Sequence, residues 1–464
     1  MHTPKDAAFA YQAVYRYLIE LIEASPAQGD HKLPSLRQLA KRLGVSVSTT
    51  KYAYSLLEDE GRIYARPKLG YFTRLMSTSL STDRSADLLD QVFANARQPG
   101  MLALGSDAPA VLLSLENPLW LMERELARHY PRALTPHYLP FGEPELRTAL
   151  AERYTRSTDS YWQADDVYIG ADLHSVLGLS LRALGLVGTV ALVESPCSWA
   201  VLRQLQAANI RVIEMPLDAH GRFDLDALQG ALAGEPIRLA VLSSTVNIPH
   251  GSLMPAQDKQ KICRWLAQRA IWLFENDTYG ELYFPPEPAR YRDFADPQKL
   301  VVFSTFDKVI GSEAPYGYVL CRGQGQAMQR QFLERAFRLS PIRQKAIAKL
   351  FTSKRIDAHL HKLRGLLHDA MTRMNRLLAE HCAGQFHVII PQGGACFWLQ
   401  AANPVDMHQV LEGLLAQRIV IVPGELFSQQ GAWKQHMRLS YTLDWSKDIT
   451  QALQLMAEAF RQSP

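Results

Sequence analysis

The sequence predicts two structural units: a small, mostly helical winged helix-turn-helix at the N-terminus, and a large α/β domain that ends in a small α/β C-terminal subdomain. Three observations lead to this fold class. Two short helical patterns joined by a glycine turn precede residue 75, helix and strand patterns alternate from about residue 100, and the excess positive charge lies in the first 75 residues. Such alternation is typical of a mostly parallel sheet covered by helices on both faces.

The composition indicates a globular chain with a sizeable core. Of its 464 residues, 47% are hydrophobic and 21% are charged, and this length favours two or three domains. The five cysteines stand singly, without C-x-x-C spacing, so we expect neither a metal site nor disulfides, and a cytoplasmic location. We also expect no signal peptide and no membrane span, because long uncharged apolar segments are missing.

The net charge of +4 is unevenly distributed along the chain. Residues 1–75 contain 5 Lys and 6 Arg against 7 Asp and Glu, whereas the other 389 residues contain 39 basic and 39 acidic side chains. The whole excess therefore lies in the N-terminal module. This distribution predicts that residues 1–75 bind a polyanion.

The N-terminal module begins with three helical patterns. Apolar residues recur at helical spacing from Tyr11 to Ile22, and this first helix ends before the turn sequence Ser-Pro-Ala-Gln-Gly. Ser35, with a glutamine three residues later, is a capping box for a second helix that stops at Gly44. Ser46 or Ser48 caps a third helix. Two short helices joined by a three-residue turn form a helix-turn-helix.

A hairpin follows the third helix. Residues 62–66 and 71–73 alternate as strands around the tip 67–70, which contains Lys68. The segments Leu-Pro-Ser-x-Arg-x-Leu-Ala-x-x-Leu-Gly-Val-Ser at 33–46, Leu-Leu-Glu-x-Glu-Gly at 56–61 and Arg-Pro-x-x-Gly-Tyr-Phe at 66–72 resemble the GntR family of bacterial regulators. The resemblance implies binding to double-stranded operator DNA. A winged helix used for protein contact is the alternative.

The expected DNA contacts divide into two groups. The start of the third helix would face base edges in the major groove, and other basic side chains would contact phosphates. The base-reading candidates are Ser46, Ser48, Thr49, Thr50 and Lys51, and the phosphate candidates are Arg37, Arg66 and Lys68. Val47 stands where the family often has a basic residue, so we expect it to meet a thymine methyl group.

The domain boundaries follow from composition and pattern. We expect the winged helix at 1–75, a Ser/Thr-rich linker with one short helix at 76–97, and the large domain at 98–464, with its C-terminal subdomain from about 350. Within the large domain, helices are expected at 147–154 and 173–184, in two long stretches after about 350 and at the C-terminus. Strands are expected at 166–169, 190–194, 210–215, 239–243, 271–275, 300–304, 317–321, 396–399 and 419–422.

Lys308 is the main candidate for chemistry in the large domain. It lies among small residues just beyond the strand pattern 300–304, where an α/β fold usually places its site. A buried lysine loses its proton and condenses with an aldehyde, which makes Lys308 a Schiff-base candidate. The alternative is an ordinary surface lysine in a loop, since lysines are seldom buried.

The large domain resembles the fold type I aminotransferases, which use pyridoxal phosphate. The segment Ser-x-Phe-x-Lys with a following Gly-Tyr pair carries this resemblance, together with a series of landmarks in the family's order. These landmarks are Tyr138-x-x-x-Gly142-x-x-x-Leu146-Arg147, Glu194-x-Pro196, Pro249-x-Gly251, Asn276-Asp277-Thr278-Tyr279, Gly393-Gly394, Pro423-Gly424 and Arg438-Leu439-Ser440. A GntR winged helix joined to such a domain resembles the MocR subfamily, and the resemblance implies a homodimer.

The resemblance assigns positions around pyridoxal phosphate. Lys308 matches the lysine that binds the aldehyde, and Tyr279 the donor to the ring oxygen. Arg438 matches the arginine that binds a carboxylate of the substrate or effector; a surface arginine is the alternative. The further family positions, where occupancy by the cofactor is in question, are Asn276, Asn247, Thr305 and Trp199.

Five residues depart from the family's pattern. Asn276 replaces the aspartate that holds the ring nitrogen protonated, Ile248 an asparagine, and Pro315 the phosphate-binding arginine. Asp172 and Asp307 stand where small or hydroxyl residues are usual. A charge-assisted hydrogen bond is worth roughly 1.5–3 kcal/mol, so these losses remove on the order of 5 kcal/mol, several thousandfold in affinity. We therefore expect weak or no binding of pyridoxal phosphate.

Three functions compete at this point. The first is a sequence-specific transcription regulator whose aminotransferase-like domain dimerises and senses an unidentified small-molecule effector, without catalysis. The second is a pyridoxal-phosphate-dependent aminotransferase with a regulatory DNA-binding domain. In the third, the large domain is only a scaffold for dimerisation. Asn276 and Pro315 favour the first and third over the second, because they remove charges that transamination requires.

Overall fold

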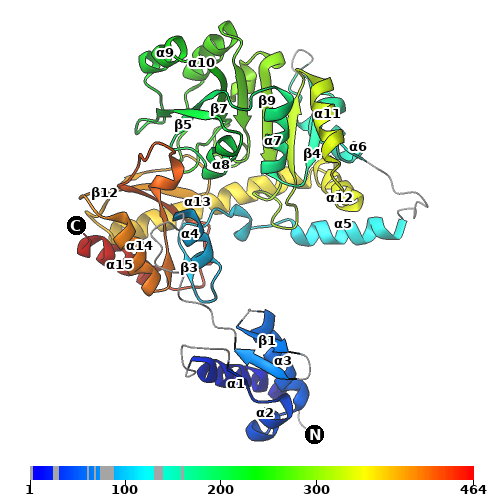
Figure 1. Cartoon of the computed structure of the whole chain (residues 1–464), viewed down its shortest axis with the longest axis vertical. Coiled ribbons are helices and arrows are strands. Elements are labelled where there is room, and N and C mark those ends of the chain that lie inside the picture. Colours follow the sequence, from blue (N-terminus) through cyan, green and yellow to red (C-terminus); the bar gives the residue numbers. More distant parts are fainter. Residues whose placement is uncertain are drawn as a thin grey trace. The chain divides into compact units, whose positions relative to one another are not determined.

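The computed structural model describes residues 4–23, 31–59, 62–66, 69–73, 88–129, 139–157 and 161–463. The chain divides into two compact units, Met1–Gln91 and Val92–Pro464 (Figure 1). Among the described residues, no helix combines the length and apolar character needed to cross a membrane. The same residues contain no cluster of three or more His, Cys, Asp or Glu that could hold a metal ion.

The described residues of the first unit form helices and an antiparallel hairpin. In order they are α1 (Pro4–Glu23), α2 (Leu36–Leu43), α3 (Val47–Asp59), β1 (Ile63–Arg66) and β2 (Gly70–Thr73). The predicted capping box is confirmed, because the Gln38 amide N donates to Ser35 Oγ at 3.3 Å and the Ser35 amide N to Gln38 Oε1 at 3.0 Å. Gly44 ends α2 with φ of 66°, a conformation that favours glycine. Ser46 caps α3 through its contact with the Thr49 amide, 3.0 Å.

A small apolar core holds this unit together. Side chains from all three helices and from β1 meet in it, and Tyr54 anchors the edge by donating its hydroxyl to the carbonyl of Pro34 at 2.6 Å. The buried members are Val14, Leu18, Leu33, Leu39, Ala53, Tyr54, Leu57 and Ile63. The predicted winged helix-turn-helix is therefore confirmed, with its hydrophobic spacing accounting for the packing.

The second unit is built on a seven-stranded sheet. In spatial order its strands are β4 (Val167–Gly170), β10 (Gly317–Cys321), β9 (Leu300–Thr305), β8 (Trp272–Asn276), β7 (Ile237–Ser243), β5 (Val190–Ser195) and β6 (Arg211–Pro216). The strands are parallel apart from β10, which is antiparallel to both of its neighbours. The prediction of a mostly parallel sheet is confirmed.

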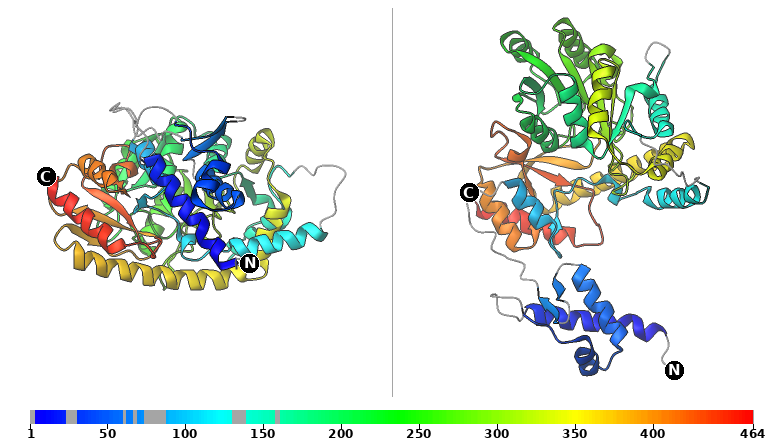
Figure 2. Two further views of the ribbon diagram at one scale, coloured as in Figure 1. Left: turned by 90° about the horizontal axis from the view of Figure 1, so that it is seen from below. Right: turned by 45° about the vertical axis from the view of Figure 1, so that its right-hand side comes forward.

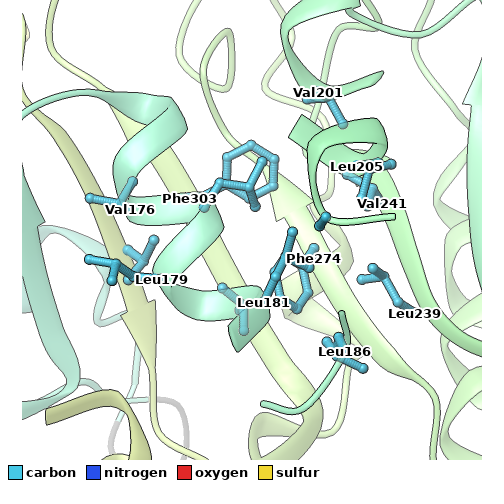
Figure 3. Packing of buried hydrophobic residues seen from close by; sticks show 14 of the residues in the cluster. Val176, Leu179, Leu181, Leu186, Val201, Leu205, Leu239, Val241, Phe274 and Phe303 are labelled. Atoms are coloured by element: carbon cyan, nitrogen blue, oxygen red, sulfur yellow. The ribbon is translucent and has the colours of Figure 1, made fainter. Parts of the chain in front are cut away.

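Helices cover this sheet, and both faces are buried. Alternate strand residues such as Val241, Phe274 and Phe303 pack against α7 (Leu173–Ala183) and α8 (Trp199–Ala207), as Figure 3 shows. Helix α11 (Gly325–Arg335) contributes Met328 and Phe332 to the same cluster. The intervening residues Ala240 and Leu273 are buried as well, and α10 (Ala256–Gln268) contacts β8. Burial on both faces explains the continuous apolar runs in the strand sequences. The remaining helices are α5 (Glu116–His129), α6 (Pro144–Tyr154), α9 (Leu225–Gly234) and α12 (Pro341–Thr352).

A smaller antiparallel sheet forms the C-terminal part of the second unit. Its strand order is β11 (Phe386–Ile389), β12 (Cys396–Ala401), β15 (His436–Ser440) and β14 (Val422–Pro423), with α14 (Met407–Ala416) and α15 (Ile449–Gln462) beside it. The long helix α13 (Arg355–His381, yellow) runs along the second unit and packs against both α12 and α15 (Figures 1 and 2).

The structure corrects one predicted strand in this region. The expected strand 419–422 is two short strands, because β13 (Ile419–Val420) pairs in parallel with β3 (Leu102–Ala103), whereas β14 pairs with β15. The chain segment around β3, which follows helix α4 (Leu88–Ala96), thus packs with the C-terminal subdomain. The pairing partner lies more than 300 residues away in the sequence, so no local pattern marks the break.

Candidate functional site

The first turn of α3 presents a polar surface. Ser46, Ser48 and Lys51 are exposed, and the hydroxyl of Ser46 lies 2.7 Å from those of Ser48 and Thr49. Val47, which we expect to meet a thymine methyl group, is 46% exposed. Tyr52, 53% exposed, lies four residues after Ser48 and shares its helix face.

Thr50 corrects the predicted base-reading set. Its side chain is fully buried and donates to the carbonyl of Ser46 at 3.2 Å, so it cannot reach a base edge. The helical period turns Thr50 toward the core between two exposed neighbours. Among the phosphate candidates, Arg37 is exposed near the start of α2, and Arg66 is exposed on β1 with its guanidinium over the rings of Tyr64 and Phe72. Lys68 lies outside the described residues.

A cavity of about 430 Å³ opens at the carboxyl ends of the parallel strands of the large sheet. This is where ligands bind in open α/β sheets. It is lined by residues that follow or end β5, β7, β8 and β9, by the start of α7, and by β15 of the C-terminal subdomain. The predicted positions that line it are Asp172, Trp199, Ile248, Asn276, Tyr279, Thr305, Asp307, Lys308, Pro315 and Arg438.

Asp107 binds the central side chains of this cavity. Its Oδ1 accepts from Lys308 Nζ at 2.5 Å and from the Tyr279 hydroxyl at 2.5 Å, and its Oδ2 lies 3.3 Å from Arg438 Nη1. The backbone carbonyl of Asp107 accepts a further bond from Lys308 Nζ at 2.9 Å. One residue of the chain therefore engages the lysine, the tyrosine and the arginine together.

The charges of this cluster stabilise one another. Burial opposes ionisation of Asp107, but the charges of Lys308 and Arg438 and two hydrogen bonds hold the pKa of Asp107 below its usual value. Burial likewise opposes the ammonium of Lys308, but the neighbouring Asp107 and Asp307 raise the pKa of Lys308. Burial and then the charge of Asp107 raise the pKa of Tyr279 well above its ordinary value, so its hydroxyl stays a donor.

A second aspartate occupies the amide-rich end of the cavity. Asp172 is the N-cap of α7, and its Oδ1 accepts from the Ser175 amide at 2.7 Å. The N-terminus of a helix attracts an anion, and here the carboxylate of Asp172 supplies it. Asn276 Oδ1 accepts from the Thr278 hydroxyl at 2.6 Å, and the Thr305 hydroxyl donates to Asp307.

The fold and these positions agree with comparisons to known proteins. Residues 126–454, well over half of the chain, match the model of aminotransferase class I and II. The chain belongs to this family. Residues 10–72 match the model of bacterial regulatory proteins of the gntR family. The predicted GntR module joined to an aminotransferase-like domain, the domain order of the MocR subfamily, is confirmed.

Two relatives match nearly the whole chain. The HTH-type transcriptional regulator YdcR of Escherichia coli is 28% identical over 97% of this chain and 99% of its own, and YjiR of the same organism is 27% identical over 97% and 98%. Among solved structures, a multiple substrate aminotransferase from Thermococcus profundus superposes with a TM-score of 0.72 at 21% identity, covering 81% of this chain and 95% of its own. The latter likeness shows the fold.

Lys308 and Arg438 are both mostly buried, which argues against the alternative that they are surface residues. The Lys308 side chain is 19% exposed inside the cavity, and Arg438 is 7% exposed on β15, where its Nη2 donates to the carbonyl of Gly105 at 2.6 Å. Neither is therefore an ordinary surface residue. Both side chains contact the carboxylate of Asp107, although they lie 130 residues apart in the sequence.

Asn247 corrects the predicted cofactor set. It is 3% exposed and does not line the cavity. Its Nδ2 donates to the carbonyl of Pro196 at 3.2 Å, and its Oδ1 accepts from the His250 amide at 3.1 Å. The amide therefore fixes two loops of the aminotransferase-like domain behind the cavity wall. Ile248, the next residue, presents an apolar side chain to the cavity in its place.

Trp199 connects the cavity wall to the segment that precedes the aminotransferase-like domain. It begins α8 and lines the cavity, and its ring meets the ring of Phe93 in α4 edge to face, with centroids 5.1 Å apart. Such aromatic pairs contribute about 0.5–1.5 kcal/mol beyond the area they bury. The contact gives a physical link between the cavity and the helix that follows the N-terminal module in sequence.

Asp107 contacts Lys308, Tyr279 and Arg438, yet no sequence motif identifies it. It lies between β3 and the short helix η1 (Pro109–Val111), 201 residues before Lys308. The local sequence Gly-Ser-Asp-Ala-Pro predicts a turn, but it does not indicate which charged residues Asp107 contacts. A carboxylate close to a turn is common on protein surfaces, so its role becomes visible only when the cavity is assembled.

Proposed function

We propose that this protein is a sequence-specific DNA-binding transcription regulator of the MocR type, acting in the cytoplasm. Its aminotransferase-like domain forms a homodimer and binds a small-molecule effector without catalysing transamination. The domain division at 1–75, 76–97 and 98–464 is part of this proposal. The observation that carries it is the pairing, in one chain, of a winged helix with an exposed polar α3 and a cavity whose lysine is bound by Asp107.

The DNA-binding role rests on the geometry of α3 and the wing. Ser46, Ser48, Lys51 and Tyr52 form an exposed helix face of suitable chemistry for base edges. Arg66 stacks on Tyr64 and Phe72 at 5.2 and 4.8 Å, which orders its guanidinium before DNA arrives. An ordered guanidinium on the wing fits a contact to the DNA backbone beside the major groove.

We expect Arg66→Ala to weaken binding to every DNA sequence and Lys51→Ala to change sequence preference. Loss of one phosphate contact lowers the slope of log affinity against log salt by about one unit. Binding is measured by fluorescence anisotropy at several salt concentrations, on an operator selected from random DNA. Arg330→Ala, which removes an exposed arginine of α11, is the charge-matched control. An unchanged salt slope for Arg66→Ala would contradict the assignment of the wing.

Loss of transaminase chemistry is supported by four features of the cavity. Asp107 binds Lys308 and favours its protonated form, which does not attack an aldehyde. Asp172 places a carboxylate at the helix terminus where a phosphate would need donors. Ile248 and Pro315 contribute neither charge nor side-chain hydrogen bond. The residues present therefore do not fit pyridoxal phosphate.

The second candidate function is a pyridoxal-phosphate-dependent aminotransferase with a regulatory domain. One observation favours it: Lys308, Tyr279 and Arg438, the matches to the family's cofactor and carboxylate residues, line one cavity. The two candidates are distinguished by incubating the protein with pyridoxal phosphate and measuring absorbance and mass after borohydride. A stoichiometric, borohydride-stable adduct on Lys308 would favour the enzyme.

We expect the protein to be a homodimer in solution. Trp120 and Leu121 of α5 are 46% and 59% exposed, and exposed large apolar side chains in a folded chain favour an interface. Light scattering should give twice the chain mass of 52.2 kDa at micromolar concentration. Leu121→Asp should shift the mass toward the monomer. Leu333→Asp on α11 should not, because Leu333 is exposed singly between buried Phe332 and charged Glu334, and single exposed apolar side chains are common on monomer surfaces. A monomeric wild-type protein would contradict this part of the proposal.

A further inference from the structure

The side chains that bind the Asp107 carboxylate indicate which chemical group of a ligand this cavity would bind. Lys308 and Arg438 bring two positive charges to one carboxylate, and the Tyr279 hydroxyl adds a donor. This is the donor set that recognises a carboxylate: two cations and a hydroxyl directed at its two oxygens. Here the carboxylate belongs to the chain itself.

The backbone next to Asp107 is fixed while the side chain reaches the solvent. The Leu104 amide donates to the Val420 carbonyl at 2.8 Å, and the Leu104 carbonyl accepts from the Ser440 amide at 2.6 Å. The Gly105 carbonyl accepts from the Arg438 guanidinium. The Asp107 side chain keeps 20% of its surface exposed. The carboxylate can therefore leave the cluster by side-chain rotation toward water, without unfolding the strand that precedes it.

The rest of the cavity wall limits what can replace that carboxylate. Trp199, Ile248 and Phe427 supply large apolar surfaces, which suit an apolar body. Asp307 lies 3.7 Å from Lys308 Nζ, and Asp172 caps α7 at the cavity wall; these two carboxylates oppose a second anionic group such as phosphate. A volume of about 430 Å³ suits a small molecule. The combination points to a ligand with one carboxylate and an apolar body.

We propose that Asp107 is a built-in ligand of this cavity, and that the effector is a small apolar monocarboxylate that displaces Asp107 from Lys308 and Arg438. This inference rests on the proposed effector-binding role and names the chemistry of the effector. Exchange of one carboxylate for another leaves the charge around the two cations unchanged. A ligand can bind only while Asp107 is away from the two cations. The apparent affinity for every such ligand is therefore the intrinsic affinity multiplied by the fraction of time that the site is free of Asp107.

The test uses the full-length protein and matched probes. Asp107→Ala leaves Lys308 and Arg438 without their shared carboxylate, so sodium acetate should raise its thermal midpoint saturably, above the effect of sodium chloride at equal ionic strength. Wild type should show no such difference. Asp307→Ala, which removes the other carboxylate beside Lys308, is the matched control and should not respond to acetate. Asp107→Ala combined with Arg438→Met should lose the response.

A second variant keeps the test decisive if Asp107→Ala does not fold. Asp107→Asn keeps the shape of the side chain and removes its charge, and it should bind 3-phenylpropionate at least tenfold more tightly than wild type by calorimetry. The amine of the same body, 3-phenylpropylamine, should bind neither protein. Equal affinities of wild type and Asp107→Asn for 3-phenylpropionate, or tighter binding of the amine, would overturn the inference. DNA binding without ligand, measured separately, reports on the proposed function itself.

Discussion

Arg292→Ala is expected to lower the free energy of unfolding by about 3–5 kcal/mol, because it removes the buried guanidinium that contacts two buried carboxylates. Arg292 Nη1 contacts Glu275 and lies 3.1 Å from Asp277 Oδ1, and the Glu275 and Asp277 side chains are 0% and 2% exposed. Burial opposes the charge of Arg292, but the two carboxylates raise its pKa. Asp277 also accepts from the Tyr154 hydroxyl at 2.5 Å, so the cluster joins α6 to the end of β8.

The stability that Arg292→Ala removes should be smaller at pH 5 than at pH 7. Burial raises the pKa of Glu275 and opposes the charge of Asp277, whereas Arg292 lowers the pKa of both. Without Arg292 the folded-state pKa of each carboxyl therefore rises, and that of Glu275 moves further above its unfolded value near 4. Such groups destabilise the fold as pH rises above about 4, so the variant should recover stability relative to wild type when pH falls from 7 to 5. Urea unfolding at both pH values measures this. Arg330→Ala, at an arginine 79% exposed, should change stability by less than about 0.5 kcal/mol.

The stability of this cluster also affects the cavity wall, because Asn276 and Thr278, which line the cavity, are the sequence neighbours of Asp277. A variant within about 1 kcal/mol of wild type at pH 7 would show that water reaches the carboxylates once the guanidinium is gone. The intermediate substitution Arg292→Lys keeps the charge but loses the forked donors, and it should fall between wild type and alanine.

Restoring pyridoxal phosphate binding is expected to require the removal of Asp107. The combined variant Asp172→Gly, Ile248→Asn, Asn276→Asp and Pro315→Arg returns the family's polar groups to the cavity wall. Restored charge-assisted bonds of roughly 1.5–3 kcal/mol each sum to on the order of 5 kcal/mol, several thousandfold in affinity. We expect a much smaller gain while Asp107 binds Lys308, and the full gain when Asp107→Ala is added.

Absorbance titration and borohydride followed by mass spectrometry measure this gain. Lys308→Ala in the fivefold variant should abolish the borohydride-stable mass increase, which places the adduct on that lysine. The single variant Pro315→Arg should help little, because Asp107 and Asp172 remain. If the fourfold variant binds as tightly as the fivefold one, Asp107 does not restrain Lys308. A wild type that binds pyridoxal phosphate stoichiometrically would return the protein to the second candidate function.

The sequence alone predicted the features that depend on near neighbours in the chain. The capping box at Ser35 follows from contacts between residues three apart, and the turn at Gly44 from the conformational freedom of glycine. The strands of the large sheet follow from short apolar runs that alternate with helical patterns. The family motifs around Lys308 and Tyr279 likewise identified the elements that meet at the cavity. Even the departures at Asp172, Ile248 and Pro315 were visible, because they are positions within motifs.

The tertiary structure decided the features that depend on distant segments. Thr50 and Lys51 are adjacent in sequence, yet the packing of α3 buries one and exposes the other. Asn247 satisfies loop amides instead of reaching the cavity, and β13 separates from β14 because β3 pairs with it. Asp107 lies 201 residues from Lys308 and 331 from Arg438. Charges so far apart in the chain pair only after the core has folded, since contact between them depends on the arrangement of the sheets and not on any local spacing.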